Sequence, residues 1–279
     1  MIALNRVKLI GYLTEKPEVR QLPSGVAVCD INLRVTTKIN REGSLQDSTS
    51  FHTVTLWRWN AENIEKYASV GSQVYIEGSL KTDSWQDENG KNRYKTKVTG
   101  DDFILLTPKT GSYPALSSSV PFASGLNSVE IIGNITKDIE LKQTTNGISV
   151  GNFSVATNKR WKDKITGEDK EETEFHNVVA WSALAEKGED LLKKGHKIFI
   201  SGRVQTRSWE TPDGEKRYTT EIVAENITLP GHESPDVPFE ASASSSYTSS
   251  SQKQEFADSM PEIPAIQYES DIKPEDLPF

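Results

Sequence analysis

Aromatic and basic residues recur together in two parts of this sequence. The stretches Ser50–Trp57 and Glu174–Trp181 resemble each other, and each carries a phenylalanine and a tryptophan six residues apart. Basic residues stand close in the chain to these aromatics and to other tryptophans. Aromatic rings stack on nucleic-acid bases while cations neutralise phosphates, and every base has a π face. The pattern therefore predicts a surface that binds single-stranded nucleic acid with little preference for base sequence.

The candidates for this surface are seven aromatic and seven basic residues. They are Phe51, Trp57, Trp85, Trp161, Phe175, Trp181 and Trp209, and Arg58, Lys81, Arg93, Lys159, Arg160, Arg207 and Arg217. A place in the hydrophobic core is the alternative for any single tryptophan, but recurrence at matching positions favours the surface. Trp59 has no aromatic counterpart and is interpreted as structural or peripheral. The basic loop 159–170 also contains acidic residues, so a merely solvated loop is an alternative there.

Side-chain alternation predicts that the aromatics lie on the outer face of β-strands. Successive side chains of a strand point to opposite faces, so Phe51 and Trp57 share one face while His52, Val54 and Leu56 share the other. The aliphatic side chains supply a core face, and exposed aromatics opposite a core face usually mark binding. The second stretch repeats this arrangement. The histidine in each stretch is therefore expected to be a buried structural residue rather than a general base.

The chain contains two copies of one domain. An offset of 122 residues aligns Leu4-Asn5 with Leu126-Asn127, and after a short insertion an offset of 124 residues aligns Phe51-His52 with Phe175-His176. Glycines and the remaining aromatics stay in step over roughly a hundred residues, which indicates a duplication.

Each copy is predicted to contain five strands, with a helix between the third and the fourth. In the first copy the strands are expected near residues 4–14, 26–36, 50–57, 73–83 and 94–106, and the helices of the two copies near 60–68 and 183–193. This order is typical of the OB-fold, a small Greek-key barrel that binds oligonucleotides and oligosaccharides. We therefore expect an all-β protein with two tandem OB-fold barrels.

The domain boundaries follow from composition. We expect the first barrel at 1–106, a linker rich in Ser, Pro and Gly at 107–125, the second barrel at 126–230 and a disordered tail at 231–279. The net charge of −8 is confined to the tail, because residues 232–279 hold ten acidic residues and two lysines. The barrels are therefore neutral and can carry local basic patches, whereas the acidic tail cannot itself hold a polyanion.

The sequence argues against an enzyme, a cofactor and a metal site. It has no phosphate-binding loop, no dinucleotide fingerprint and no nucleophile elbow, and its one cysteine, Cys29, excludes an intrachain disulfide. No apolar run approaches a membrane span, so we expect a cytoplasmic protein. Two alternatives remain open: an RNA-binding or primosome-type OB module, and a metal-dependent nuclease using the acidic residues at 101–102 or 168–174.

These residues resemble the bacterial single-stranded DNA-binding proteins that carry two OB-folds in one chain. The resemblance covers both barrels and the tail, and it rests on Leu4–Val7, Ile10-Gly11, Phe51-His52, Gly71–Gly78, Phe175-His176, Arg207–Trp209 and Arg217–Glu221. It implies that DNA stacks on the aromatic residues named above. Ile39 stands where the second copy has Trp161, so the resemblance also implies weaker binding by the first barrel.

The resemblance further implies partners and an oligomer. The last four residues, Asp276, Leu277, Pro278 and Phe279, resemble the acidic tip through which these proteins recruit replication, recombination and repair proteins. Lys273 and Pro274 interrupt the acidic run, and Leu277 replaces the usual isoleucine. An aromatic C-terminus after acidic residues suits a basic pocket with an apolar floor, the alternative being a solubilising tail. Two-barrel members resemble dimers with four barrels, which implies a homodimer here.

Overall fold

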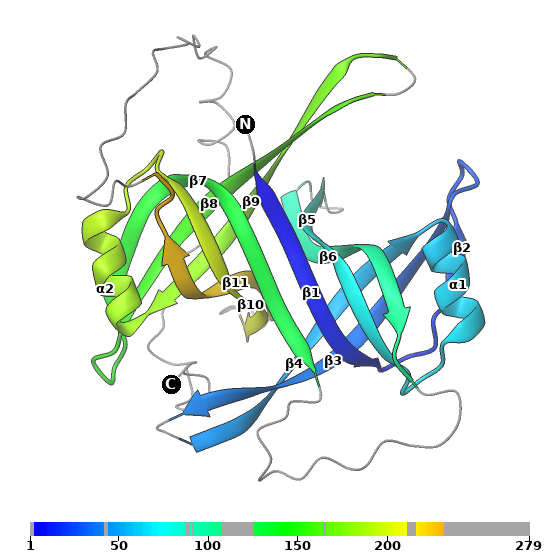
Figure 1. Cartoon of the computed structure of the whole chain (residues 1–279), viewed down its shortest axis with the longest axis horizontal. Helices are drawn as coiled ribbons and strands as arrows, with labels where there is room; N and C mark the ends of the chain where they lie inside the picture. Colours follow the sequence, from blue (N-terminus) through cyan, green and yellow to red (C-terminus); the bar gives the residue numbers. More distant parts are fainter. Residues whose placement is uncertain are drawn as a thin grey trace.

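A computed structural model describes residues 3–41, 44–86, 90, 92–107, 125–163, 166–210 and 216–231 of the chain. Their strands form two closed barrels that lie side by side, and the helices α1 and α2 lie at opposite ends of the molecule (Figure 1). The prediction of an all-β protein with two tandem OB-folds is confirmed. The predicted linker and tail fall outside the described residues, apart from Thr107, Gly125 and Gly231.

The first barrel consists of six strands and one helix. They are β1 (Leu4–Leu13), β2 (Val19–Gln21), β3 (Ala27–Arg41), β4 (Ser44–Trp57), α1 (Trp59–Tyr67), β5 (Gln73–Gln86) and β6 (Asn92–Leu105). Antiparallel pairing of β1 with both β3 and β5, and parallel pairing of β4 with β6, close the barrel. The short strand β2, which pairs with β3, was not expected from the sequence.

The second barrel repeats this plan without a counterpart of β2. It consists of β7 (Leu126–Gln143), β8 (Ser149–Lys162), β9 (Asp169–Trp181), α2 (Ser182–Leu191), β10 (Lys197–Glu210) and β11 (Lys216–Thr228). Pairing of β7 with β10 and of β9 with β11 closes it. In the first barrel the second and third OB strands are longer than expected, and in both barrels these two strands form a hairpin that extends beyond the barrel, in opposite directions (Figure 1).

Alternating aliphatic residues fill each barrel. In β5, for example, Val74, Ile76 and Leu80 are buried, while the half-buried Tyr75, Glu77 and Ser79 face outwards. Glycines permit the bends. A Cβ atom on Gly78 would lie 2.1 Å from the carbonyl oxygen of Thr99, and a β-bulge begins at this glycine. Gly78 therefore lies at a bend of the barrel that a residue with a side chain could not occupy without moving the neighbouring strand.

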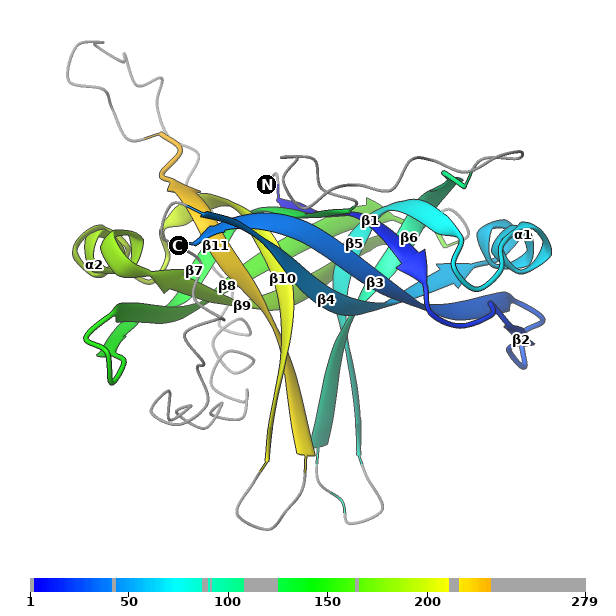
Figure 2. The ribbon, with the colours of Figure 1, turned by 90° about the horizontal axis from the view of Figure 1, so that it is seen from below.

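The two barrels share one sheet. Strand β1 pairs with β7 in an antiparallel ladder that runs from Leu4 opposite Ile132 to Ile10 opposite Leu126 (Figure 1). The β5–β6 and β10–β11 hairpins point the same way and lie side by side (Figure 2), and the Thr220 hydroxyl donates a hydrogen bond of 3.3 Å to the carbonyl oxygen of Thr96 between them. The barrels therefore hold a defined relative position.

Candidate nucleic-acid interface

The aromatic residues of β4 lie on the outside of the first barrel. Phe51 is 61% exposed and Trp57 is 40% exposed, whereas His52, Val54 and Leu56 are buried. Alternation along a strand that closes a barrel accounts for this division, because one face must line the core. The predicted division between two faces is confirmed.

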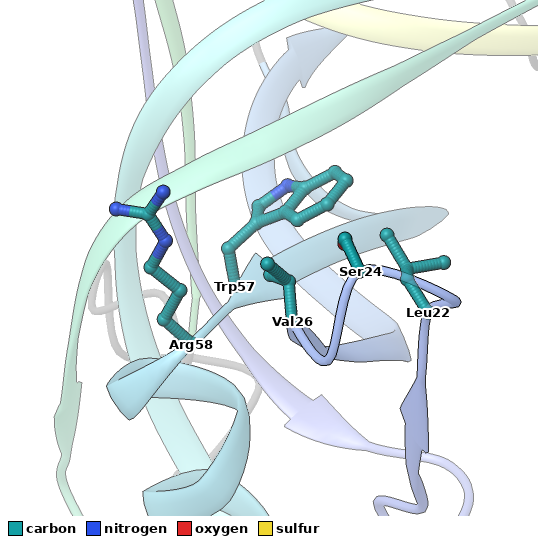
Figure 3. Close-up of a pocket in the computed structure, with 5 residues that line it drawn as sticks. All are labelled: Leu22, Ser24, Val26, Trp57 and Arg58. Atoms are coloured by element: carbon teal, nitrogen blue, oxygen red, sulfur yellow. The ribbon is translucent and has the colours of Figure 1, made fainter. Parts of the chain in front are cut away.

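An open hollow lies beside Trp57. It has a volume of about 390 Å³ and is bounded by Trp57, Arg58 and the turn that contains Leu22, Ser24 and Val26 (Figure 3). Figure 3 shows the indole and the guanidinium rising from the end of β4 beside this turn. Arg58 has φ +52°, a conformation rare for residues with a side chain. This geometry places a cation next to an aromatic ring, as base stacking with phosphate neutralisation requires.

The equivalent aromatics of the second barrel are less exposed. Phe175 and Trp181 are both half-buried, and Trp181 packs against Val150 and Val179. Trp161, near the end of β8, is 40% exposed. Trp181 therefore contributes to packing as well as to the predicted surface.

The predicted aromatics of the β5–β6 and β10–β11 hairpins pair with basic residues on the neighbouring strand. Trp85 is 49% exposed, and its backbone pairs with that of Arg93 across β5 and β6. The backbones of Trp209 and Arg217 pair in the same register across β10 and β11. The side chains of Trp209 and Arg217 lie outside the described part of the chain.

Three of the predicted DNA-binding cations are engaged in ion pairs. Lys81 Nζ lies 2.8 Å from Glu172, and the same barrel junction contains a hydrogen bond of 3.0 Å from the Thr82 backbone N–H to the carboxylate of Glu174. The hydrogen bond to Glu172 raises the pKa of Lys81, and burial raises the pKa of Glu174. In the second barrel Arg160 lies 3.0 Å from Glu171. These cations must share or exchange their partners to reach a phosphate.

The third pair shows that the barrels differ in charge. Arg207 of β10 lies 3.7 Å from Glu221 of β11. At the equivalent positions of the first barrel, Asp83 of β5 lies 2.7 Å from Lys97 of β6, so the charges are reversed. Burial raises the pKa of Glu221 to about 7, while Arg207 and Arg203 act in the opposite direction.

Among the described side chains, the exposed cations of the predicted set are Arg58, Lys159 and the ion-paired Arg160. Lys159 lies close enough to Asp101, which belongs to the other barrel, to lower the pKa of that carboxyl, although burial of Asp101 has the larger and opposite effect. The Arg93 side chain is half-buried, and Arg93 already interacts with another group of the chain.

The two predicted structural histidines are buried. His52 Nε2 lies 2.8 Å from the Ser50 hydroxyl, and His176 Nε2 lies 2.9 Å from the Thr157 hydroxyl. Burial lowers the pKa of each histidine to about 4. They are therefore neutral at physiological pH and serve the barrel interior. Cys29 is also buried, and burial raises the pKa of its thiol, as suits a packed residue rather than a nucleophile.

The described part of the chain has no group of three or more His, Cys, Asp or Glu side chains placed to hold a metal ion. Neither α1 nor α2, the helices it contains, is long and apolar enough to cross a membrane.

Sequence reasoning missed two residues beside Phe51. Arg34 of β3 pairs in register with Phe51 of β4 on one side and with Tyr12 of β1 on the other. Arg34 is exposed on the same outer face as Phe51. Its outward parity in the alternating stretch 31–36 was a usable signal, but the neighbour on β1 depends on strand pairing that no local pattern reveals.

Comparisons with known proteins identify the family. The single-strand binding protein family model matches residues 4–106 and again 126–230. The single-stranded DNA-binding proteins of Thermus thermophilus and Thermus aquaticus are 31% and 30% identical over 229 residues, covering 81% of this chain and 84% of each relative. The crystal structure of the wild-type single-stranded DNA-binding protein from Thermus aquaticus has a TM-score of 0.65 at 25% identity, over 87% of this chain and 98% of that one. This chain therefore belongs to the single-strand binding protein family, with one family domain in each barrel.

Proposed function

We propose that this protein binds single-stranded DNA without sequence preference and protects it during replication, recombination and repair. The observation that carries the proposal is the pair of exposed aromatics, Phe51 and Trp57, on the outer face of a barrel strand in a member of this family. Stacking on such rings suits every base, and nearby cations add affinity that falls with salt. The family consists of non-enzymatic DNA-binding proteins, in agreement with the expectation that the chain is not an enzyme. We place this activity in the cytoplasm, at the nucleoid.

Trp57 and Trp59 provide a matched pair for the test. Both tryptophans are exposed, but Trp59, at 70%, lies outside the predicted surface at the start of α1. Replacing Trp57 by alanine should weaken binding of a dT oligomer by about 1 to 3 kcal/mol, whereas Trp59→Ala should leave it unchanged. Fluorescence anisotropy of a labelled oligomer at several salt concentrations measures both. Equal effects of the two substitutions would remove the stacking role from Trp57.

Two further experiments distinguish DNA binding from the alternative functions. Unlabelled poly(dT) should displace the labelled oligomer at lower concentration than an RNA of the same length, and the reverse order would favour the RNA-binding or primosome-type module. Incubating labelled DNA with the protein and magnesium should leave the DNA intact, because binding at the proposed surface does not cleave DNA. Cleavage would favour the metal-dependent nuclease.

We further propose that the C-terminal tip recruits the partner proteins. The support is in the sequence, where Asp276, Leu277, Pro278 and Phe279 combine acidic groups with an aromatic C-terminus. These residues lie outside the described part of the chain. Deleting the four residues should abolish capture of replication and repair proteins while leaving DNA binding intact or slightly stronger. Capture by the truncated chain at full strength would refute this role.

We propose a homodimer assembled through the sheet that joins the barrels. On its outer face, Ile10 pairs with Tyr75, and at the equivalent place in the other barrel Ile132 pairs with Phe199. All four side chains are half-buried in the single chain, so each barrel offers an apolar row to a second copy. Light scattering should give the mass of two chains, and the double variant Y75R/F199R should give the mass of one. A single-chain mass for the unaltered protein would contradict the dimer.

A further inference from the structure

We propose that Tyr12, Arg34 and Phe51 form a nucleotide-binding row on the first barrel that the second barrel lacks. The inference deepens the proposed function and rests on it. Three adjacent strands bring the residues together, since Tyr12 pairs with Arg34 and Arg34 pairs with Phe51. All three side chains lie on the outer face, because the residues on both sides of Tyr12 and Arg34 are buried, as is His52 next to Phe51.

The chemistry of the row alternates an aromatic ring, a cation and a second ring. The guanidinium carbon of Arg34 lies 6.0 Å from the centre of the Tyr12 ring, within the range of a cation–π contact. The rings of Tyr12 and Phe51 are separated by two strand spacings, about 10 Å. A strand of DNA crossing the row would meet a stacking surface, a phosphate partner and a second stacking surface in turn.

Arg34 is available to a phosphate. Unlike Lys81, Arg160 and Arg207, it forms no ion pair with a carboxylate among the described residues. Arg34 is also exposed, and its contact with the Tyr12 ring does not neutralise its charge.

The row depends on a close approach of β1 to β3. A Cβ atom on Gly11 would lie 2.8 Å from the carbonyl oxygen of Arg34, so a larger residue next to Tyr12 would push the two strands apart. Gly11 therefore allows β1, whose pairing with β7 ends at Ile10, to pair with β3 at Tyr12.

The second barrel has the same register with different chemistry. Asn134 pairs with Ala156, and Ala156 pairs with Phe175, at the positions equivalent to the row. Its additional ring is instead Trp161, where the first barrel has Ile39. We infer that each barrel has its own fourth stacking element, on β1 in the first and at the tip of the β8–β9 hairpin in the second.

Exchanging residues between the barrels tests the row in the full-length chain. The variant Y12N/R34A gives the first barrel the residues that the second already accommodates at the same register, so the fold should survive, as thermal unfolding by circular dichroism will check. Binding of a labelled dT oligomer should weaken about tenfold, and the slope of log affinity against log salt should become shallower by about 0.7, the value for one phosphate contact. The reciprocal variant N134Y/A156R should bind more tightly than the unaltered chain.

A second measurement uses the unaltered protein. An oligomer carrying 5-iododeoxyuridine should photo-crosslink to Tyr12, identified by mass spectrometry. If the unaltered chain binds DNA, then an unchanged affinity and salt slope in Y12N/R34A, or crosslinks that omit Tyr12 while including Trp57, would overturn the row alone. Failure of the unaltered chain to bind any dT oligomer would instead overturn the proposed function.

Discussion

Val7 of β1 lies directly opposite Val129 of β7, and the two valines occupy equivalent positions in the duplicated domain. The ladder extends equally on both sides, so that Leu4 pairs with the counterpart of Ile10 and Ile10 pairs with the counterpart of Leu4. This is the arrangement of an isologous interface, in which the same surface patch meets itself. One chain thereby reproduces internally what two identical barrels would form by association.

Two equivalent asparagines, Asn5 of β1 and Asn127 of β7, hydrogen-bond this junction to the β5–β6 and β10–β11 hairpins. The Asn5 side chain donates to the carbonyl oxygen of Leu80 at 2.8 Å and accepts from its N–H at 2.9 Å, and Asn127 bonds Val204 in the same way. Asn127 also lies within hydrogen-bond distance of the Ser50 hydroxyl in the other barrel. Asn5→Ala should cost about 2 kcal/mol of unfolding free energy, because two backbone groups lose their partner. Asn127→Ala should cost about 3 kcal/mol.

Urea denaturation measures both asparagine variants. Asn134 also lies on β7, away from the hydrogen bonds of Asn5 and Asn127. Asn134→Ala is therefore the control, and it should lower the unfolding free energy less than either variant. An effect of Asn127→Ala equal to or smaller than that of Asn5→Ala would show that the contact between barrels adds no stability.

Releasing Lys81 from its partner should strengthen DNA binding. Glu172→Gln removes the carboxylate that lies 2.8 Å from Lys81, and the side chains are 43% and 38% exposed, so the loss of stability should stay below about 1 kcal/mol. The freed ammonium should tighten dT binding a few-fold and steepen the salt slope by about 0.7. Glu168 is an exposed carboxylate directly before β9, the strand that contains Glu172, so Glu168→Gln controls for net charge. Equal gains from both variants would mean that Lys81 does not reach the DNA.

Glu221 should make the protein less stable as the pH rises. Its pKa is about 7 in the folded chain, against an ordinary 4.5, because burial favours the neutral form. The folded state therefore holds a proton that the unfolded chain releases, and this contribution is complete below about pH 4.5 and lost as the pH passes 7. Glu221→Gln should remove a stability difference on the order of 2 to 3 kcal/mol between pH 5 and pH 8.

Unfolding by urea at both pH values tests the Glu221 prediction. Glu225→Gln on the same strand is the control, since that carboxylate is exposed and lies 3.4 Å from Arg203. A pH dependence that survives in Glu221→Gln would place its source elsewhere.

Arg58 should strengthen DNA binding while its backbone conformation lowers the stability of the fold. Its backbone adopts φ +52°, which glycine tolerates and other residues resist. Arg58→Gly should therefore be about 1 kcal/mol more stable than Arg58→Ala, although both lose the guanidinium beside Trp57 and should bind dT equally weakly. Thermal unfolding and anisotropy measure the two quantities. Equal stability of the glycine and alanine variants would show that the conformation carries no strain.

The sequence predicts the parts of this fold that depend on local alternation. Phe51, Trp57 and Trp85 were assigned to the outer face because a strand has a period of two, and the structure places them there. The same reasoning buried His52 and His176. Duplication then extended each assignment from one barrel to the other.

Contacts between distant strands could not be predicted in this way. The pairing of Lys81 with Glu172 joins residues 91 positions apart in different barrels, so a cation near a tryptophan in the sequence could not be recognised as already engaged. The alignment of Tyr12 with Arg34 likewise depends on where β1 exchanges its pairing with β7 for pairing with β3. The short β2 was missed because three residues, Val19–Gln21, show too little periodicity.

The reversed ion pairs, Asp83 with Lys97 and Arg207 with Glu221, have a consequence for how DNA meets the molecule. In an assembly of identical chains every substitution appears in all copies at once, so the two ends of a paired unit stay interchangeable. Joining the copies in one chain lets each change alone. The two ends of this molecule are therefore distinguishable, and a strand running 5′ to 3′ across it meets a different order of side chains from a strand running the opposite way.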